Sequence, residues 1–292
     1  MCKPADPHHI SASVVFNQPL SENKYLLRLL APEVVKRTRP GHFIHLNCHP
    51  SLTLPRPFSI MDADSGLGTL DVFYQVVGEG TEYMSRWQAG SKTTLLGPVG
   101  VPFEHPGKST YALLIAGGIG YAPLDFLARQ LKKSGIELTL LLGMESQDPP
   151  FELTSGHTPL PHDPVANPKA LARQEFLGIP SRLASLIPQP GFFQGYVTQL
   201  ATEILQNMNE ETRQRTRIYT CGPTPMMVAA AKVAKQFNLS GQVSLEEFMA
   251  CGFGGCAGCI APIQDSDETW SYRRVCTDGP VFSMDAVRWD QI

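Results

Sequence analysis

The feature that most constrains the fold of this sequence is the segment 111–142, in which two apolar runs flank a glycine turn and a helical stretch. The runs cover residues 111–116 and 138–142, and the helical stretch covers 123–133. Such runs are typical of parallel strands that are buried on both faces and joined by a crossover helix. The segment therefore predicts a βαβ unit within an α/β domain. Further elements of this domain are expected as a helix over 197–208, a strand over 217–220, a helix over 224–237 and a strand over 242–246.

The chain before residue 105 has a different pattern, with short β-favouring stretches separated by turn residues. Closely spaced strands without long helices between them predict a small antiparallel barrel or sandwich. In the stretch 69–77, alternating residues suggest a strand that is buried mainly on one side. The predicted strands cover 13–16, 25–30, 42–47, 69–77 and 92–96.

The region 146–190 is rich in proline and interrupts the alternation of strands and helices. Because proline lacks an N–H group and fixes φ, we expect mostly loop or short helix here. We interpret the region as an ordered surface excursion. A lid or a partner-docking arm is the alternative.

Composition excludes several classes of function. The chain has 292 residues, of which 42% are hydrophobic and 17% charged, and its formal net charge is -3. This length predicts more than one domain, and the weak negative charge argues against nucleic-acid binding. No apolar run approaches the roughly 20 residues of a membrane span, and residues 1–7 contain no stretch of signal-peptide type. We therefore expect a cytoplasmic protein.

Four of the seven cysteines lie near the C-terminus, in the spacing C-x4-C-x2-C followed by a distant fourth cysteine. This leading spacing is that of plant-type [2Fe-2S] sites. Glycines between the first three cysteines would let the backbone wrap a cluster and direct N–H groups at its sulfurs. Arg273 and Arg274 could offset the negative charge of the cluster. Structural zinc is the alternative, although zinc ligands usually come in two short pairs.

Two motifs in the predicted barrel suit a flavin dinucleotide. Arg56-Pro-Phe-Ser offers a guanidinium for a phosphate, an aromatic ring for a planar ring and a hydroxyl for a heteroatom. Gly78-Glu-Gly-Thr follows a strand and opens a helical stretch, whose first N–H groups could bind a pyrophosphate. An ordinary helix cap made by Thr81 is the alternative.

Two motifs in the α/β domain suit a nicotinamide nucleotide. Gly117-Gly-Ile-Gly lies between a strand and a helix, where open α/β sheets bind phosphates, although it does not match G-x-G-x-x-G. Cys221-Gly-Pro follows the strand predicted over 217–220 and so lies at its carboxyl end. A small thiol beside glycine would let a nicotinamide approach closely. The alternatives are a tight strand-to-helix connection and a buried free cysteine.

Together these motifs resemble the ferredoxin-NADP reductase superfamily, which pairs a flavin-binding barrel with a nucleotide-binding domain. With the cysteine loop at the C-terminus, their order is similar to that of the electron-transfer subunits of two-subunit (type B) dihydroorotate dehydrogenases. The resemblance covers most of the chain. Its motifs are Arg56-Pro-Phe-Ser, Tyr74-Gln-Val-Val-Gly-Glu-Gly-Thr, Gly97-Pro-Val-Gly, Gly117-Gly-Ile-Gly-Tyr-Ala-Pro-Leu, Cys221-Gly-Pro, the cysteine loop and Val275-Cys-Thr-Asp-Gly-Pro-Val-Phe.

The resemblance implies an α/β plus β fold with an N-terminal antiparallel flavin-binding β-barrel (1–104), a parallel-sheet NAD-binding domain (105–241) and a small C-terminal [2Fe-2S] domain (242–292). It implies that the cluster ligands are Cys251, Cys256, Cys259 and Cys276. It places FAD at Arg56, Pro57, Phe58, Ser59, Phe73, Tyr74, Gln75, Gly80 and Thr81. It places NAD at Gly117, Gly118, Gly120, Gly222 and Pro223, with Cys221 as the catalytic residue.

The resemblance also implies a function in pyrimidine biosynthesis. A separate FMN-containing subunit would oxidise dihydroorotate, and its electrons would pass through the cluster and FAD to NAD+, in a heterotetramer. Because nicotinamide takes two electrons at once and the cluster moves one at a time, a carrier must split the pair, and a flavin can do so. This chain cannot perform the first step, since the (β/α)8 barrel expected of the partner needs about 250 residues.

Two other functions stay open at this point. Reductase-type subunits of sulfhydrogenases and of ferredoxin-NAD(P) transhydrogenases share the cofactor order, and motifs at cofactor sites identify the cofactor better than the partner. A non-enzymatic nucleotide sensor with a structural metal site is the second alternative. The chain departs from the family in the longer excursion over 146–190 and in Val101-Pro102, which replaces a small polar pair. These departures affect the partner and the nucleotide pocket.

Overall fold

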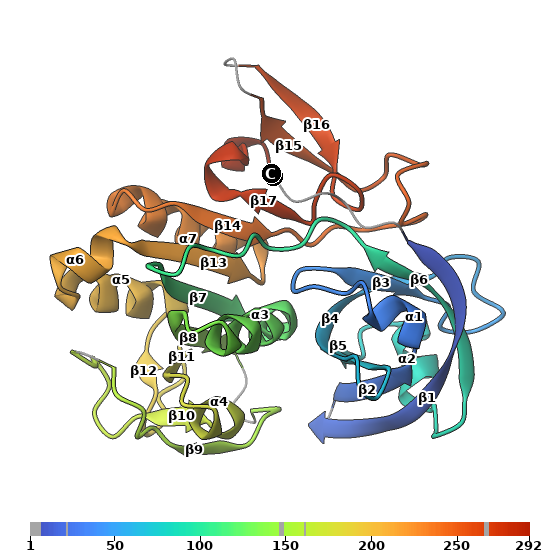
Figure 1. The fold of residues 1–292 in the computed structure, drawn as a ribbon, viewed down its shortest axis with the longest axis horizontal. Helices are drawn as coiled ribbons and strands as arrows, with labels where there is room; N and C mark the ends of the chain where they lie inside the picture. Colours follow the sequence, from blue (N-terminus) through green and yellow to red (C-terminus); the bar gives the residue numbers. More distant parts are fainter. Residues whose placement is uncertain (1–6, 22, 146–148, 161, 266–268) are drawn as a thin grey trace. The chain divides into compact units, whose positions relative to one another are not determined.

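The computed structural model describes residues 7–21, 23–145, 149–160, 162–265 and 269–292. Figure 1 traces the chain from the N-terminal barrel in blue to the C-terminal segment in red. The chain forms two compact units. The first contains Met1–Glu104, Ser244–Phe282 and Ala286–Ile292, and the second contains His105–Val243 and Ser283–Asp285. The division into three domains stays a prediction.

The first unit is built around a closed barrel of antiparallel strands, as the short N-terminal strands predict. Its order is β1-β2-β5-β4-β3-β6, and β6 pairs with β1, so the barrel strands leave no open sheet edge. Two short helices connect the strands, α1 (Pro32–Val35) and α2 (Glu79–Ser85). The strands are β1 (His8–Ser21), β2 (Lys24–Leu30), β3 (Phe43–Leu46), β4 (Arg56–Asp64), β5 (Thr69–Gln75) and β6 (Lys92–Val99).

Strand β5 is buried on both faces, so the expected burial on one side was wrong. Asp71, on the face expected to be open, is only 4% exposed. Arg28 lies opposite it on β2 and donates Nε to Oδ1 at 2.6 Å and Nη2 to Oδ2 at 2.7 Å. This bidentate pair replaces the water that the carboxylate loses on burial.

The C-terminal segment of the first unit packs on the barrel. Val101, just beyond β6, forms a parallel bridge with Pro280, and its N–H donates to the carbonyl of Gly279. An antiparallel hairpin follows the cysteine loop and consists of β15 (Ile260–Gln264) and β16 (Trp270–Arg274). The chain ends with β17 (Val281–Ser283), η2 (Met284–Ala286) and η3 (Trp289–Gln291), of which Ser283–Asp285 belong to the second unit.

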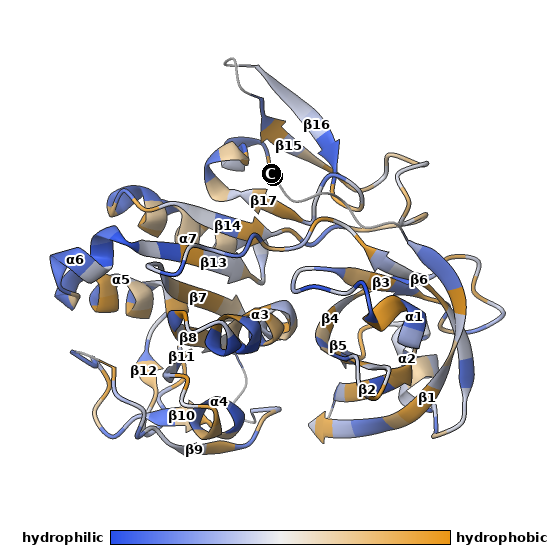
Figure 2. Ribbon diagram, viewed as in Figure 1, coloured by the Kyte–Doolittle hydropathy of each residue, from blue (hydrophilic) through white to orange (hydrophobic). Residues whose placement is uncertain are grey.

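The second unit is an α/β domain whose sheet runs in the order β12-β11-β8-β7-β13-β14. The pairs that β7 makes with β8 and β13 are parallel, as the apolar runs predict. Strand β7 is hydrophobic and helix α6 is hydrophilic (Figure 2), because the strand is enclosed while the helix contacts solvent. The elements are β7 (Tyr111–Gly117), η1 (Gly118–Gly120), α3 (Tyr121–Lys133), β8 (Glu137–Met144), β9 (Leu153–Ser155), β10 (Lys169–Leu171), α4 (Ala172–Phe176), β11 (Ser181–Ser185), β12 (Phe193–Gln194), α5 (Val197–Asn207), α6 (Glu210–Gln214), β13 (Thr216–Cys221), α7 (Thr224–Gln236) and β14 (Gly241–Ser244).

The proline-rich region contains a strand of the main sheet, which the sequence did not predict. Strand β11 pairs in parallel with β8, and all five of its residues are buried. Its Arg182 is only 2% exposed and donates Nε to Oδ2 of Asp163 at 2.5 Å. The polar residues of β11 obscured the strand pattern, and the excursion itself supplies the carboxylate that compensates the buried charge. Residues 146–148 and 161 lie outside the described residues.

Among the helices of the described residues, none combines the length and the apolar character that a bilayer crossing requires.

We expect His42, which precedes β3, to make the first unit less stable as the pH falls. Its ring is buried, and Nδ1 accepts a hydrogen bond from the N–H of Arg39 at 3.0 Å. Burial, together with the charge of Arg39, lowers the pKa of His42 from 6.5 to about 3. Below pH 6.5 the unfolded chain therefore gains a proton that the folded chain excludes, which reduces the free energy of unfolding by about 1.4 kcal/mol per pH unit.

Denaturant titrations on both sides of pH 6.5 measure this dependence. The variant His42→Gln should lose part of the slope. An identical slope in the variant and the wild type would contradict the expectation.

Candidate functional site

The predicted flavin motif opens strand β4. Arg56 lies opposite Leu46 and Ser59 lies opposite Phe43 in the register with β3. Because side chains alternate along a strand, Arg56 and Phe58 face one side of the sheet and Ser59 faces the other. All of these motif side chains are half-buried, so they remain accessible to a ligand.

The first turn of helix α2 lies against the arginine of this motif. A Cβ built on Gly80 would lie 3.4 Å from Cγ of Arg56, and Gly80 is buried. The structure therefore brings together a guanidinium and the N-terminal turn of a helix, which fits the pyrophosphate of FAD. The hydroxyl of Thr81 accepts hydrogen bonds from the N–H groups of Val77 at 2.9 Å and Gly78 at 3.2 Å. That hydroxyl thus serves as a helix cap, which was the alternative to a flavin contact.

The other residues expected at FAD lie at the end of strand β5. Tyr74 and Phe73 are buried, whereas Gln75 is half-buried. The hydroxyl of Tyr74 donates to Oδ1 of Asn17 at 3.2 Å, and its ring meets Phe58 edge-on with centroids 6.0 Å apart. Tyr74 therefore supports Phe58 from within the barrel. Burial raises the pKa of its hydroxyl well above the usual value, so Tyr74 stays neutral.

The two predicted nucleotide motifs lie side by side in the second unit. Strands β7 and β13 are adjacent and parallel, and Ala116 is in register with Cys221. The turn after each strand is therefore at the same carboxyl edge of the sheet, the edge at which open α/β sheets bind ligands. Gly117 ends β7, Gly118 and Gly120 bound η1, and Gly222 and Pro223 follow β13. Helix α3 begins at Tyr121, two residues before the predicted start.

The thiol of Cys221 is fully buried at this edge. A Cβ built on Gly120 would collide with the carbonyl of Cys221, so only glycine permits the close approach of the two turns. The juxtaposition of the motifs fits a nucleotide whose nicotinamide lies near Cys221.

We expect Gly120→Ala to destabilise the second unit by about 1–3 kcal/mol, because the methyl group would overlap the Cys221 carbonyl and force the turns apart. The midpoint of denaturant unfolding measures this loss. The matched control is Gly107→Ala, since a Cβ built on Gly107 has no heavy atom within 4 Å. Equal unfolding midpoints for Gly120→Ala and Gly107→Ala would contradict the close contact between Gly120 and the Cys221 carbonyl.

The four predicted cluster ligands lie together in the first unit, and their contacts run in pairs. The N–H of Cys276 donates to Sγ of Cys259 at 3.4 Å, and the Cys251 thiol is hydrogen-bonded to the Cys256 side chain. Among the residues that the structure describes, no group of three or more His, Cys, Asp or Glu side chains is arranged to hold one metal ion. Two pairs of thiols fit a two-iron cluster in which each iron takes two cysteines.

Backbone N–H groups of the loop point at the sulfurs. Burial raises the pKa of the Cys251 thiol, but hydrogen bonds from the N–H groups of Phe253, Cys256 and Gly255 outweigh it and lower the pKa to about 7. Burial and the neighbouring Cys259 raise the pKa of Cys276 to about 12, against a hydrogen bond from the Gly254 backbone. Amides directed at thiols are what a cluster with negatively charged sulfurs requires.

The two arginines expected beside the cluster have different partners. Nη1 of Arg274 donates to the carbonyl of Gly254 at 2.8 Å, so its charge lies at the cysteine loop. Nη2 of Arg273 donates to Oδ1 of Asp265 at 2.6 Å. Arg273 thus pairs with the carboxylate of Asp265, and its expected contribution to offsetting the cluster charge stays a prediction.

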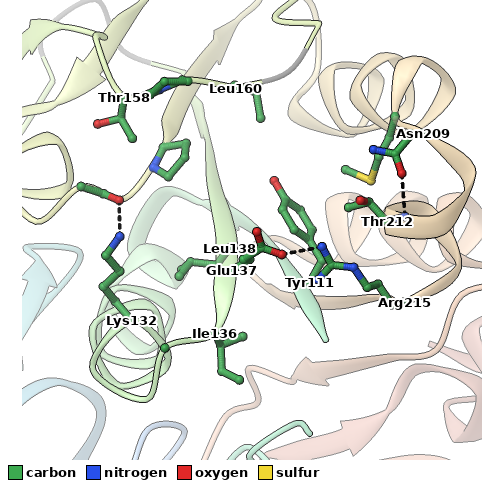
Figure 3. Close-up of a pocket in the computed structure, with 15 residues that line it drawn as sticks. Tyr111, Lys132, Ile136, Glu137, Leu138, Thr158, Leu160, Asn209, Thr212 and Arg215 are labelled. Carbon is green, nitrogen blue, oxygen red and sulfur yellow. Dashed lines mark hydrogen bonds and ion pairs between the residues drawn. The ribbon is translucent and has the colours of Figure 1, made fainter. Parts of the chain in front are cut away.

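A cavity of about 480 Å³ lies at the opposite edge of the second unit's sheet (Figure 3). Tyr111 and Glu137, at the amino ends of β7 and β8, line it together with Arg215. Nη2 of Arg215 pairs with Oε2 of Glu137, and Nζ of Lys132 donates to the carbonyl of Gly178 at 2.6 Å. Each of these charged groups therefore has a hydrogen-bond partner. None of the predicted site residues is among those that line the cavity.

The fold has a close counterpart among solved structures. The structure of an NADH-dependent reduced ferredoxin-NADP oxidoreductase superposes with a TM-score of 0.78, at 24% sequence identity, over 96% of this chain and 90% of that one. A ferredoxin-NADP+ reductase from Neisseria gonorrhoeae, solved with FAD and NADP, gives a TM-score of 0.60 at 15% identity, over 78% of this chain and 91% of that one. The barrel and the α/β sheet therefore have the fold of the ferredoxin-NADP reductases.

Residues 246–288 match the family described as the iron-sulfur cluster binding domain of dihydroorotate dehydrogenase B. A relative from Caldanaerobacter subterraneus subsp. tengcongensis, the electron transfer subunit of dihydroorotate dehydrogenase B (NAD(+)), is 32% identical over 85% of this chain and 86% of its own length. The chain belongs to the family of dihydroorotate dehydrogenase B electron transfer subunits.

Proposed function

We propose that this chain takes electrons from an FMN-containing, dihydroorotate-oxidising partner and passes them through a [2Fe-2S] cluster and FAD to NAD+. The observation that carries the proposal is the cysteine loop, whose paired thiols and inward N–H groups lie in the same compact unit as the flavin barrel. Relatives of this family carry the name of an NAD(+)-dependent enzyme's electron transfer subunit.

Each group of residues has one role in this proposal. Cys251, Cys256, Cys259 and Cys276 hold the cluster, and Arg274 offsets part of its charge through the loop. Arg56 and the first turn of α2 bind the pyrophosphate of FAD, while Phe58, on the same face of β4 as Arg56, contacts its ring. Bound FAD supplies a carrier that exchanges electrons singly with the cluster and in pairs with NAD+.

The carboxyl ends of β7 and β13 in the second unit orient NAD+. The turn over Gly118–Gly120 opens helix α3, where N–H groups are available to phosphates. The nicotinamide packs against Cys221, whose side chain is buried, small and polarizable. Gly222 and Pro223 keep bulky side chains away from the nicotinamide. In this role Cys221 positions the nicotinamide and transfers no proton.

The partner would dock beside the cysteine loop. Phe248 is 96% exposed just before the first ligand, and Phe253 and Tyr272 are also exposed. Exposed aromatic side chains are enriched at protein interfaces. We propose a heterotetramer with the catalytic subunit in the cytoplasm, a reducing compartment that keeps cysteine thiols available to bind a cluster.

The test is to purify the tagged chain from its own host without oxygen and to assay dihydroorotate-dependent reduction of NAD+ in the material that co-purifies. We expect turnover together with a subunit that carries FMN. A preparation that oxidises NADH with a dye but gives no such turnover would exclude the dihydroorotate partner. The reductase subunits of sulfhydrogenases and transhydrogenases would then be the better match.

A further inference from the structure

His45 lies on β3, between the strand that carries the flavin motif and the loop that carries the cluster ligands. In the barrel it is opposite Pro57 of β4 and Leu96 of β6. A Cβ built on Gly252 would lie 2.9 Å from each of Nδ1, Cγ and Cε1 of the ring. The imidazole therefore packs against the backbone of the cysteine loop, immediately after Cys251. All of these residues belong to the first unit.

Glycine is required at position 252 for two reasons. Its φ is +74°, in the left-handed region that other residues adopt at a cost in free energy. A side chain there would also displace the imidazole of His45. The backbone conformation at Gly252 thus fixes the loop, and the pairing of β3 in the barrel fixes the position of His45.

The ring nitrogens of His45 have no partner within the described part of the chain. The side chain is 1% exposed, and neither Nδ1 nor Nε2 makes a hydrogen bond to a described residue. The cross-strand neighbours Pro57 and Leu96 offer no side-chain acceptor, and Phe43 presents an aromatic ring at a centroid distance of 5.9 Å. A buried donor without an acceptor is unfavourable, so the acceptor is expected to come from a bound group.

The protonation state of the ring is set by its surroundings. Burial, together with the charge of Arg56, lowers the pKa of His45 to about 4. A neutral imidazole carries one N–H, which is one hydrogen bond to donate. Sulfur atoms of an iron-sulfur cluster accept such hydrogen bonds.

We propose that His45 is a positioning residue for the cluster, which donates one imidazole N–H to a sulfur atom of the bound [2Fe-2S] group and holds the cysteine loop against the flavin strand. The proposal rests on the ligand set given under Proposed function. A hydrogen bond to sulfur stabilises the reduced, more negative cluster more than the oxidised one. His45 therefore raises the reduction potential of the cluster.

The test compares His45→Phe, which keeps a ring but loses the N–H, with His45→Gln, which keeps a donor. Both are measured as the full, cluster-loaded chain in a redox titration that follows the cluster by electron paramagnetic resonance and the flavin by absorbance. We expect His45→Phe to shift the one-electron equilibrium of the cluster about tenfold towards the oxidised form, about 59 mV. His45→Gln should recover most of this shift.

His42→Phe is the matched control, since His42 is also a buried histidine beside β3 but its ring contacts the backbone N–H of Arg39. An unchanged cluster potential in His45→Phe, an equal shift in His42→Phe, or a shift confined to the flavin would each overturn the proposal. The pair His45→Leu and His45→Asn repeats the contrast in smaller side chains if His45→Phe does not fold.

The titration separates this proposal from the proposed function, because it needs neither dihydroorotate nor the partner. A wild-type chain that assembles no [2Fe-2S] cluster would overturn the ligand set and the role of His45 together. A loaded His45→Phe chain with the wild-type potential would overturn the role of His45 alone.

Discussion

Cys276→Ser should abolish the cluster and, with it, electron transfer from the partner. Cys276 is buried, and its thiol is hydrogen-bonded to the side chain of Cys259, so its loss removes one member of a thiol pair. Because losing even an outer-shell partner typically costs 10–100-fold in metal affinity or activity, losing a ligand should reduce dihydroorotate-dependent NAD+ reduction by at least about 100-fold. Iron content, the visible spectrum of the cluster and the assay with the partner measure the result.

The same variant should still oxidise NADH with a dye acceptor, since that reaction needs only the flavin and nucleotide sites. Cys48→Ser is the control for the loss of a buried thiol. Cys48 lies in the same unit and donates its Sγ–H to the carbonyl of Leu46 at 3.6 Å. Its iron content should match the wild type. Full iron content in Cys276→Ser would disprove its assignment as a ligand.

The second large effect is expected from Arg56→Ala, which should weaken FAD binding by about 10–100-fold. Hydrogen bonds from a charged donor contribute about 1.5–3 kcal/mol, and Cγ of Arg56 would lie 3.4 Å from a Cβ built on Gly80 in the first turn of α2. The guanidinium already donates Nη1 to the carbonyl of Leu54 at 2.8 Å, which holds it in place for a phosphate. Equilibrium dialysis or flavin fluorescence gives the dissociation constant.

Arg39→Ala is the matched control, because Arg39 is an exposed arginine in the loop between α1 and β3 of the same unit. It should bind FAD as the wild type does. Arg56→Lys should fall between the two, since lysine keeps the charge but not the planar fork. If Arg56→Ala retained wild-type affinity, the phosphate would have to be bound elsewhere.

The parts of the fold that follow from local pattern were predictable from the sequence. The apolar run of β7 and the glycine turn after it were sufficient for a parallel strand and a crossover helix. The cysteine spacing likewise predicted a loop with N–H groups directed at sulfur, and such N–H groups contact Cys251, while the joint cluster site stays a prediction. In each case neighbours in sequence determine the geometry.

The parts that depend on partners distant in sequence were not predictable. Strand β11 was missed because Arg182 makes it look polar, and its compensating Asp163 lies in the excursion. The sequence placed Asp71 on a solvent-exposed face, because its partner Arg28 lies on another strand, β2. His45 gave no signal beyond a histidine between apolar residues, since its contact, Gly252, is more than two hundred positions away.

The most direct test of the account is a single turnover in the purified complex without oxygen. Dihydroorotate is added in the absence of NAD+, and the cluster is followed by electron paramagnetic resonance while the flavins are followed by absorbance. We predict that the cluster signal of the reduced form appears and the flavin bands bleach, and that NAD+ then reverses both changes with formation of NADH. A cluster that stays oxidised while NADH forms would contradict the proposed route through Cys251, Cys256, Cys259 and Cys276.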